Sequence, residues 1–202
     1  MKAELNKYQE AEAKFAGLNV VLVGLPGSGK SSLMDSLSIA PNYLSLGDIT
    51  RKELNSNGAM AEAIREKFKS VDPWPADFVI GIITSHLIKA KNGFVLDGIP
   101  RKSSEASALI EWTATHNIPI DLLLHLQINP KITLDRIATR NNSGRLETAA
   151  HYESRMNAYL AEEEDMLEIL KKGVKRSLTI NTDNNPAGFA KSVLLDFVLD
   201  NF

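Results

Sequence analysis

A glycine-rich segment near the amino terminus constrains the fold of this chain more than any other feature. Its residues satisfy the pattern GxxxxGK[ST]: Gly24-Leu25-Pro26-Gly27-Ser28-Gly29-Lys30-Ser31. A short apolar run at 18–23 precedes it and predicts a buried strand, and the stretch at 32–39 after it predicts a helix. Glycines let several backbone amides point at one phosphate chain, and the positive end of the helix faces the same anion. The segment therefore predicts a phosphate-binding loop of an α/β protein.

The side chains of this loop suit a nucleotide with bound magnesium. Lys30 is placed to reach the β- and γ-phosphates, and the hydroxyl of Ser31 or Ser32 is placed to serve the magnesium shell. We expect ATP to contact the loop at Gly24, Pro26, Gly27, Ser28, Gly29, Lys30, Ser31 and Ser32. The loop alone does not identify the reaction, because several classes of nucleotide-binding protein use it.

Composition narrows the class of protein. The 202 residues suit one domain with a sizeable core, and 23 basic against 25 acidic residues give a net charge of −2. This balance argues against a protein that coats nucleic acid or a membrane surface. The absence of cysteine excludes disulfides and a cysteine nucleophile. No signal peptide or membrane-spanning run is visible, so we expect a cytoplasmic protein with no nucleic-acid or membrane partner.

Strand and helix patterns alternate along the chain. Apolar strands are expected at 18–23, 43–46, 93–96, 122–128 and 178–181. Helices are expected at 32–39, 48–70 (two, broken near Asn57-Gly58), 77–90, 103–115, 130–140, 146–172 (one long acidic helix) and after Asn185-Pro186. Strands that are apolar throughout predict a five-stranded parallel sheet with helices on both faces. Residues 1–17 are expected to form a helical extension to one domain at 18–202.

Three further segments carry a family resemblance. Residues 43–51 (YLSLGDITR) resemble the STGD…R segment of adenylate kinases, and residues 94–101 (FVLDGIPR) resemble their LLDGFPR segment. Residues 135–145, with DRIATR followed by SGR, resemble the DRxxxR…SGR segment of the short-lid form. The order and spacing match over about residues 18–200, so the chain resembles the nucleoside monophosphate kinases. The resemblance implies a fold like that of P-loop NTPases, with a small flap at about 48–76 that binds the nucleoside monophosphate (NMP) and a lid at about 140–145.

The resemblance implies reversible transfer of the γ-phosphoryl group of Mg-ATP to an NMP, with AMP as the first expectation. Such transfer needs positioning and charge neutralisation, for which arginine forks suit phosphate oxygens. The implied catalytic residues are Lys30, Arg101, Arg140, Arg145 and Arg155. On the ATP side the implied residues are Arg136, over the base, and Asn185. On the NMP side they are Leu46, Arg51, Trp74, Gly98, Arg101 and Glu105, while Asp97 would orient magnesium through water.

Simpler interpretations stay open beside these roles. The arginines of 136–145 also suit a solvated helix end, and Asp97 also suits a turn that follows a strand. Trp74 would either stack on a base or fill the core.

Departures from the family pattern leave the acceptor base open. Glu105 stands where the family has a glutamine that reads adenine, and Leu46 replaces a threonine. An ionised glutamate only accepts hydrogen bonds, so it suits a base edge with two donors, such as guanine. It equally suits a helix start without touching a base. GMP, CMP, UMP or a deoxy-NMP are therefore alternative acceptors.

Other departures bear on activity. Ser31-Ser32 replaces the usual Gly-Thr. Of a usual acidic pair after Arg145, Glu147 would replace one member and Thr148 stands where the other would be. Arg155 is one residue closer to Arg145 than usual. One residue turns a helix by about 100°, so Arg155 must be re-aimed by a loop or point elsewhere. A non-catalytic nucleotide-binding protein is the alternative from a different class. We expect ATP and an NMP as partners, and a monomer.

Overall fold

The computed structural model describes residues 2–69, 73–139, 149–184 and 187–202. At its centre is a parallel sheet of five strands in the order β2-β3-β1-β4-β5. The strands are β1 (Asn19–Val23), β2 (Tyr43–Ser45), β3 (Phe94–Asp97), β4 (Leu122–Gln127) and β5 (Arg176–Asn181). The predicted α/β fold with a five-stranded parallel sheet is therefore confirmed.

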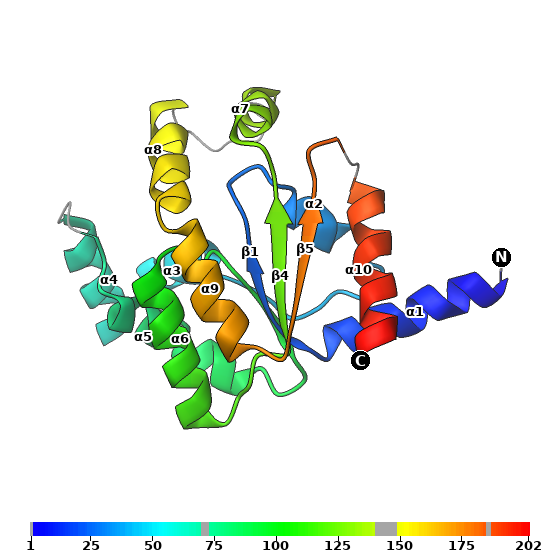
Figure 1. The fold of residues 1–202 in the computed structure, drawn as a ribbon. Coiled ribbons are helices and arrows are strands. Elements are labelled where there is room, and N and C mark those ends of the chain that lie inside the picture. Colours follow the sequence, from blue (N-terminus) through cyan, green and yellow to red (C-terminus); the bar gives the residue numbers. More distant parts are fainter. Residues whose placement is uncertain (1, 70–72, 140–148, 185–186) are drawn as a thin grey trace.

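Helices cover both faces of the sheet (Figure 1). They are α1 (Lys2–Ala16), α2 (Lys30–Asp35), α3 (Leu46–Leu54), α4 (Ala59–Lys69), α5 (Ala76–Lys89), α6 (Ser103–His116), α7 (Pro130–Thr139), α8 (Ala149–Leu160), α9 (Glu163–Gly173) and α10 (Ala187–Asn201). Successive strand residues point to opposite faces, so each strand contributes to two cores. In β1, Val21 and Val23 face the core under α5, α6 and α9, whereas Val20 and Leu22 face α1, α2 and α10.

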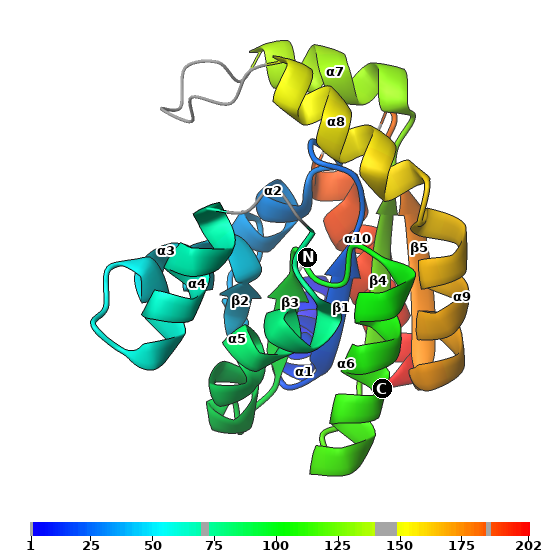
Figure 2. The ribbon, with the colours of Figure 1, turned by 90° about the vertical axis from the view of Figure 1, so that its left-hand side faces the viewer.

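The predicted single helix over 146–172 is wrong. Helix α8 ends at Leu160, and α9 begins at Glu163 after a turn. Two neighbouring acidic side chains make different long-range contacts at this break. Glu162 Oε2 accepts from the Ser103 backbone amide at 2.9 Å and from the Ser103 hydroxyl, and Glu163 Oε1 lies 3.2 Å from His125 Nε2 on β4. These contacts let α9 pack beside the sheet while α8 rises past the carboxyl ends of the strands (Figure 2).

Smaller differences concern helix and strand ends. Helix α2 covers Lys30–Asp35, whereas the sequence predicts a helix at 32–39. It begins earlier because Gly29, in the left-handed conformation, already turns the chain into the helix. Strand β5 begins at Arg176 rather than at Leu178, since it pairs with β4 from Leu122 onward.

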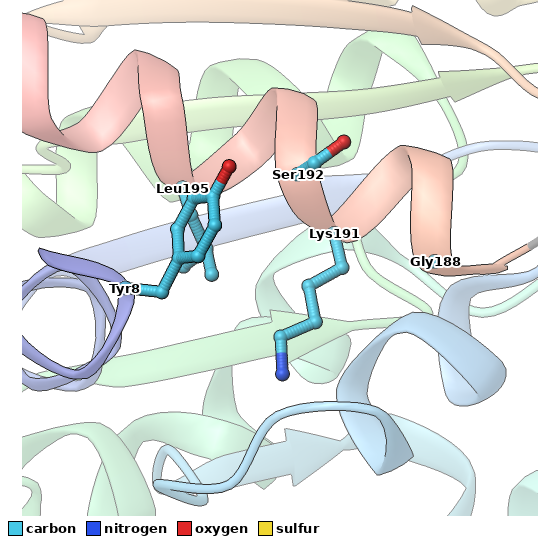
Figure 3. A pocket seen from close by; sticks show the side chains of 5 residues that line it. All are labelled: Tyr8, Gly188, Lys191, Ser192 and Leu195. Carbon is cyan, nitrogen blue, oxygen red and sulfur yellow. The ribbon is translucent and has the colours of Figure 1, made fainter. Parts of the chain in front are cut away.

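The amino-terminal helix α1 packs along α10 and contributes to the core. Ala11 and Phe15 are fully buried there. Glu12 forms an ion pair with Lys191 of α10 at 2.6 Å and accepts from the amides of Ser38 and Ile39 at 2.9 Å. A small pocket beside this pair is lined by Tyr8, Gly188, Lys191, Ser192 and Leu195 (Figure 3). The predicted domain boundary at residue 17 stays a prediction, although α1 is packed into one face of the domain.

Among the described residues, no helix combines the length and the apolar character that crossing a membrane requires.

Candidate active site

The glycine-rich loop joins β1 to α2 at the carboxyl edge of the sheet (Figure 1). Gly24, Gly27 and Gly29 have φ values of 146°, 88° and 95°. A Cβ at Gly24 would lie 2.4 Å from the backbone oxygen of Leu126, so only glycine fits between the loop and β4. The glycines therefore hold the loop in a backbone conformation that side chains would not allow, as a phosphate-binding loop requires.

The side chain of Lys30 folds back onto the backbone of this loop. Its Nζ donates to the backbone oxygens of Gly24 at 2.7 Å and Leu25 at 3.2 Å, and lies 4.0 Å from Asp97 Oδ1. The ammonium group thus lies where the loop backbone and an acidic strand end meet. Phosphate oxygens placed in the loop would compete with the carbonyl oxygens for this charge.

Asp97 ends β3, and its two carboxylate oxygens have different surroundings. Oδ2 accepts a hydrogen bond from the Tyr43 hydroxyl of β2. Oδ1 is buried and accepts no hydrogen bond from any residue that the structure describes. Burial, and then the charge of Asp97, raises the pKa of Tyr43, so its hydroxyl stays protonated and remains a donor.

The donors around this site suit magnesium held mainly by phosphates and water. Within the described part of the chain, no three histidine, aspartate or glutamate side chains form a cluster that could hold a metal ion. Magnesium prefers oxygen ligands. Oδ1 of Asp97, which is buried near Lys30, and the hydroxyls of Ser31 and Ser32 at the start of α2 are such ligands. These residues fit an ion that arrives with its nucleotide.

Arg136 of α7 connects the glycine-rich loop to the loop after β5. Its Nη2 donates to the backbone oxygens of Thr182 at 2.5 Å and Asp183 at 2.9 Å, and its Nη1 donates to that of Gly27 at 3.5 Å. Thr182 completes the connection, because its hydroxyl donates to the Ser28 backbone oxygen at 3.1 Å. The guanidinium is thus fixed beside the loop by contacts with two segments, the glycine-rich loop and the loop after β5.

The other predicted arginines of the donor side fall into two groups. Arg155 lies half-buried on α8, which passes over the carboxyl end of the sheet (Figure 2). The predictions for Arg140, Arg145, Glu147, Thr148 and Asn185, and for the lid, lie outside the described residues.

On the acceptor side, two predicted arginines flank the start of α3. A Cβ on Gly98, which has φ of 82°, would lie 3.2 Å from Arg101 Nη2 and 3.7 Å from Leu46 Cβ. A Cβ on Gly47 would lie 3.4 Å from Nη1 of Arg51, which pairs with Asp48 in the same helix. The structure therefore brings Leu46, Gly98 and Arg101 together, with Arg51 next to them and exposed.

Glu105 lies in the first turn of α6 and is only 6% exposed. Its Oε2 accepts a hydrogen bond from the backbone amide of Arg101 at 2.7 Å. The carboxylate thus stabilises the turn that carries Arg101.

Trp74 lies in an aromatic cluster with Phe68 of α4 and Phe78 of α5. Its ring meets Phe68 and Phe78 edge to face, at centroid distances of 5.1 and 5.5 Å. The side chain is half-buried and packs against the larger core. Stacking of Trp74 on a base stays a prediction.

Sequence reasoning missed Tyr43 and Thr182 as parts of this site. Tyr43 reaches Asp97 only because β2 and β3 are neighbours in the sheet, and Thr182 reaches Ser28 only because β5 ends beside the loop. The one available signal was that both residues lie at strands whose carboxyl ends form the ligand-binding edge of α/β sheets.

Comparison with known proteins identifies the family. The family model described as adenylate kinase matches residues 22–175. An adenylate kinase of Prochlorococcus marinus (strain MIT 9301) is 26% identical over 155 residues, covering 76% of this chain and 84% of the relative. One of Mycolicibacterium smegmatis (strain ATCC 700084 / mc(2)155) is 28% identical over 162 residues, or 78% and 88% of the two chains. One of Geobacillus sp. (strain WCH70) is 32% identical over 127 residues, or 61% and 59%. The chain belongs to the adenylate kinase family of nucleoside monophosphate kinases.

Proposed function

We propose that this kinase transfers the γ-phosphoryl group of Mg-ATP reversibly to AMP, giving two ADP. The observation that carries AMP as acceptor is the hydrogen bond between Glu105 Oε2 and the Arg101 amide. Oε2 is thus engaged within the chain, which removes one of the two oxygens that a base edge with two donors would use. The relatives described above are all named adenylate kinases.

The loop and Lys30 hold the donor phosphates in this proposal. Lys30 exchanges the carbonyl oxygens of Gly24 and Leu25 for phosphate oxygens, and the amides of the loop bind the same anion. Arg136, fixed between the Gly27 and Thr182 backbones, lies over the base of ATP. Ser31, Ser32 and Asp97 would hold magnesium together with ATP, through water, and the ion would supply positive charge to the phosphates.

Arg51 and Arg101 hold the acceptor phosphate in this proposal, which is supported by the position of Arg51 beside Gly47 and of Arg101 beside Gly98. Gly98 lets the acceptor approach the backbone, because a side chain there would meet Arg101. An acceptor phosphate oxygen then forms a bond to the γ-phosphorus as the bond from that phosphorus to the bridging oxygen of ATP breaks. No covalent enzyme intermediate is needed, since the arginines supply positioning and neutralise charge.

Closure of the site completes the proposal. Arg140 and Arg145 of the lid, together with Arg155, close on the phosphates and exclude water from the transfer. All residues assigned to the two nucleotides belong to one chain, so we propose that the protein acts as a monomer.

Transfer to a different NMP, such as GMP, is the second candidate function, and the side chain of Glu105 favours it. Oε2 binds the Arg101 amide, which leaves Oε1 to accept from the two neighbouring donors of a guanine edge. Leu46, 8% exposed beside Gly98, offers that base an apolar contact in place of a hydroxyl.

An assay of nucleoside diphosphate formation separates the two candidates. The purified protein with Mg-ATP is given AMP, GMP, CMP, UMP and their deoxy forms in turn, beside Lys30→Ala as a negative control. We expect AMP to have the highest kcat/KM. A higher value for GMP or a pyrimidine would overturn AMP as acceptor and keep the reaction. No turnover with any acceptor, while ATP still binds, would overturn the proposed activity.

A further inference from the structure

We propose that Tyr43 is a positioning residue for phosphoryl transfer. Its hydroxyl holds one oxygen of Asp97, so that the other oxygen faces Lys30 and the phosphates with their magnesium. This inference rests on the proposed function, because it names a residue that prepares the same site.

The sheet brings the two side chains into contact. β2 and β3 are parallel neighbours, with Tyr43 opposite Val95 and Ser45 opposite Asp97. Asp97 is thus two residues further along the sheet than Tyr43, a step of about 6.6 Å, on the same face. The length of a tyrosine side chain covers this step, and its hydroxyl donates to Oδ2.

The hydrogen bond makes the two oxygens of Asp97 unequal. A carboxylate without a fixed partner turns about its terminal bond, which is only weakly restricted. With Oδ2 held by Tyr43, Oδ1 stays buried without a hydrogen bond, 4.0 Å from Lys30 Nζ. A buried carboxylate oxygen that accepts no hydrogen bond is costly for the nucleotide-free protein even with a cation 4.0 Å away, and a ligand that satisfies this oxygen recovers that cost.

The hydroxyl of Tyr43, rather than its ring, carries the proposed role. The ring packs half-buried against the core under α2 and α10, which a phenylalanine would also do. The hydroxyl does not contribute to this apolar packing. It lies beside two polar side chains of the site, those of Asp97 and Ser31. It donates to Asp97, and a hydrogen bond from Ser31 opposes the rise of its pKa that burial and Asp97 cause. Tyr43 therefore connects the start of α2 to the end of β3.

The experiment compares Tyr43→Phe with Tyr8→Phe. Tyr8 is a matched control, because it is also half-buried and lines the pocket between α1 and α10 (Figure 3), to which no residue of the glycine-rich loop contributes. The metal readout is the affinity of Mn²⁺ for the complex with ATP, measured by electron paramagnetic resonance at saturating ATP without an acceptor. Steady-state kinetics give kcat and KM with Mg-ATP, and thermal unfolding of the nucleotide-free proteins reports the fold.

We expect Tyr43→Phe to weaken Mn²⁺ binding by about threefold to tenfold and to lower kcat by about tenfold, as for the loss of one hydrogen bond to a charged group. KM for each nucleotide should stay within about twofold, because binding of the nucleotides does not use the hydroxyl. Tyr8→Phe should match the wild type in all three quantities.

Unchanged Mn²⁺ affinity in a folded Tyr43→Phe protein would overturn the inference, and so would an equal loss in Tyr8→Phe. If Tyr43→Phe lowers the unfolding temperature, Mn²⁺ binding is measured well below that temperature. The measurement then still tests the role of the Tyr43 hydroxyl in a folded protein. Absence of turnover in the wild type would instead overturn the proposed function. The Mn²⁺ comparison would then still test Tyr43.

Discussion

The carboxylate of Glu105 accepts a hydrogen bond from the backbone amide of Arg101, with 2.7 Å between Oε2 and N. The side chain at the start of α6 thus fixes the backbone of a residue assigned to the acceptor phosphate. One contact therefore links Glu105, at the position that sets acceptor preference in the family resemblance, to Arg101, which we propose binds the acceptor phosphate.

Replacement of Glu105 separates a role in the turn from a role in reading the base. Glu105→Gln keeps an acceptor for the Arg101 amide, so the ranking of acceptors should stay the same. Glu105→Ala leaves that amide unpaired and should cost about 1–2 kcal/mol of unfolding free energy. It should also lower kcat/KM for the acceptor. The acceptor assay and urea unfolding measure these effects, and a tenfold change of ranking in Glu105→Gln would show that the side chain reads the base.

Removal of the positively charged side chain of either Lys30 or Arg101 should abolish most turnover. Lys30→Ala and Arg101→Ala should each lower kcat at least about a hundredfold, because each removes a charge that stabilises the transferring group. Exposed Lys91 and Arg176, outside the site, provide the matched controls Lys91→Ala and Arg176→Ala, which should keep wild-type rates. Steady-state kinetics with Mg-ATP test this, and near-wild-type rates in Lys30→Ala or Arg101→Ala would contradict that residue's assignment.

Two glycine substitutions should have opposite effects on stability. Gly24→Ala places a Cβ 2.4 Å from the Leu126 backbone oxygen at a φ of 146°. It should lower the free energy of unfolding by about 2–4 kcal/mol, and it should also weaken the binding of ATP. Gly188→Ala, at the start of α10, has nothing within 4 Å of its new Cβ and should stabilise by about 0.5–1 kcal/mol. Chemical denaturation and ATP titration measure both, and equal stability of the two variants would contradict this account of the loop.

The ion pair between Glu12 and Lys191 should make stability depend on pH. Burial alone would raise the pKa of Glu12, but Lys191 and the amides of Ile39 and Ser38 hold it below its ordinary value of 4.5. A carboxyl group with a lowered folded pKa stabilises the fold fully above its unfolded pKa, and this contribution disappears as the pH falls through the folded value. Glu12→Gln should therefore cost about 1–3 kcal/mol at pH 7, with the difference shrinking below pH 4.5.

Glu10→Gln is the control for this prediction, because Glu10 lies on the same helix in an exposed pair with Lys14. It should change the unfolding free energy by less than about 0.5 kcal/mol at either pH. Urea unfolding of both variants at pH 7 and pH 4 provides the comparison. A constant difference for Glu12→Gln across this range would show that the pair does not stabilise α1.

The sequence predicts the sheet because its signals are local. Each strand is a short apolar run, since both faces of a parallel sheet are covered, and Gly24 and Lys30 follow the first run directly. The break between α8 and α9 could not be predicted in this way. Residues around Glu162 continue a helical pattern, and the contact that fixes the turn is made with Ser103, far away in the sequence. The same holds for Tyr43, whose partner depends on strand order.

The packing of α1 on α10 has a consequence for the order in which the fold is completed during synthesis. Phe15 and Ala11 need α10 to cover them, yet nearly the whole described chain is translated between the two helices. Contacts so distant in sequence form late, because a long loop must close before they contribute. The apolar side of α1 therefore stays uncovered during synthesis until α10 has been made. A polypeptide stalled before α10 would expose this side to chaperones, while the glycine-rich loop and its neighbouring strands are already complete.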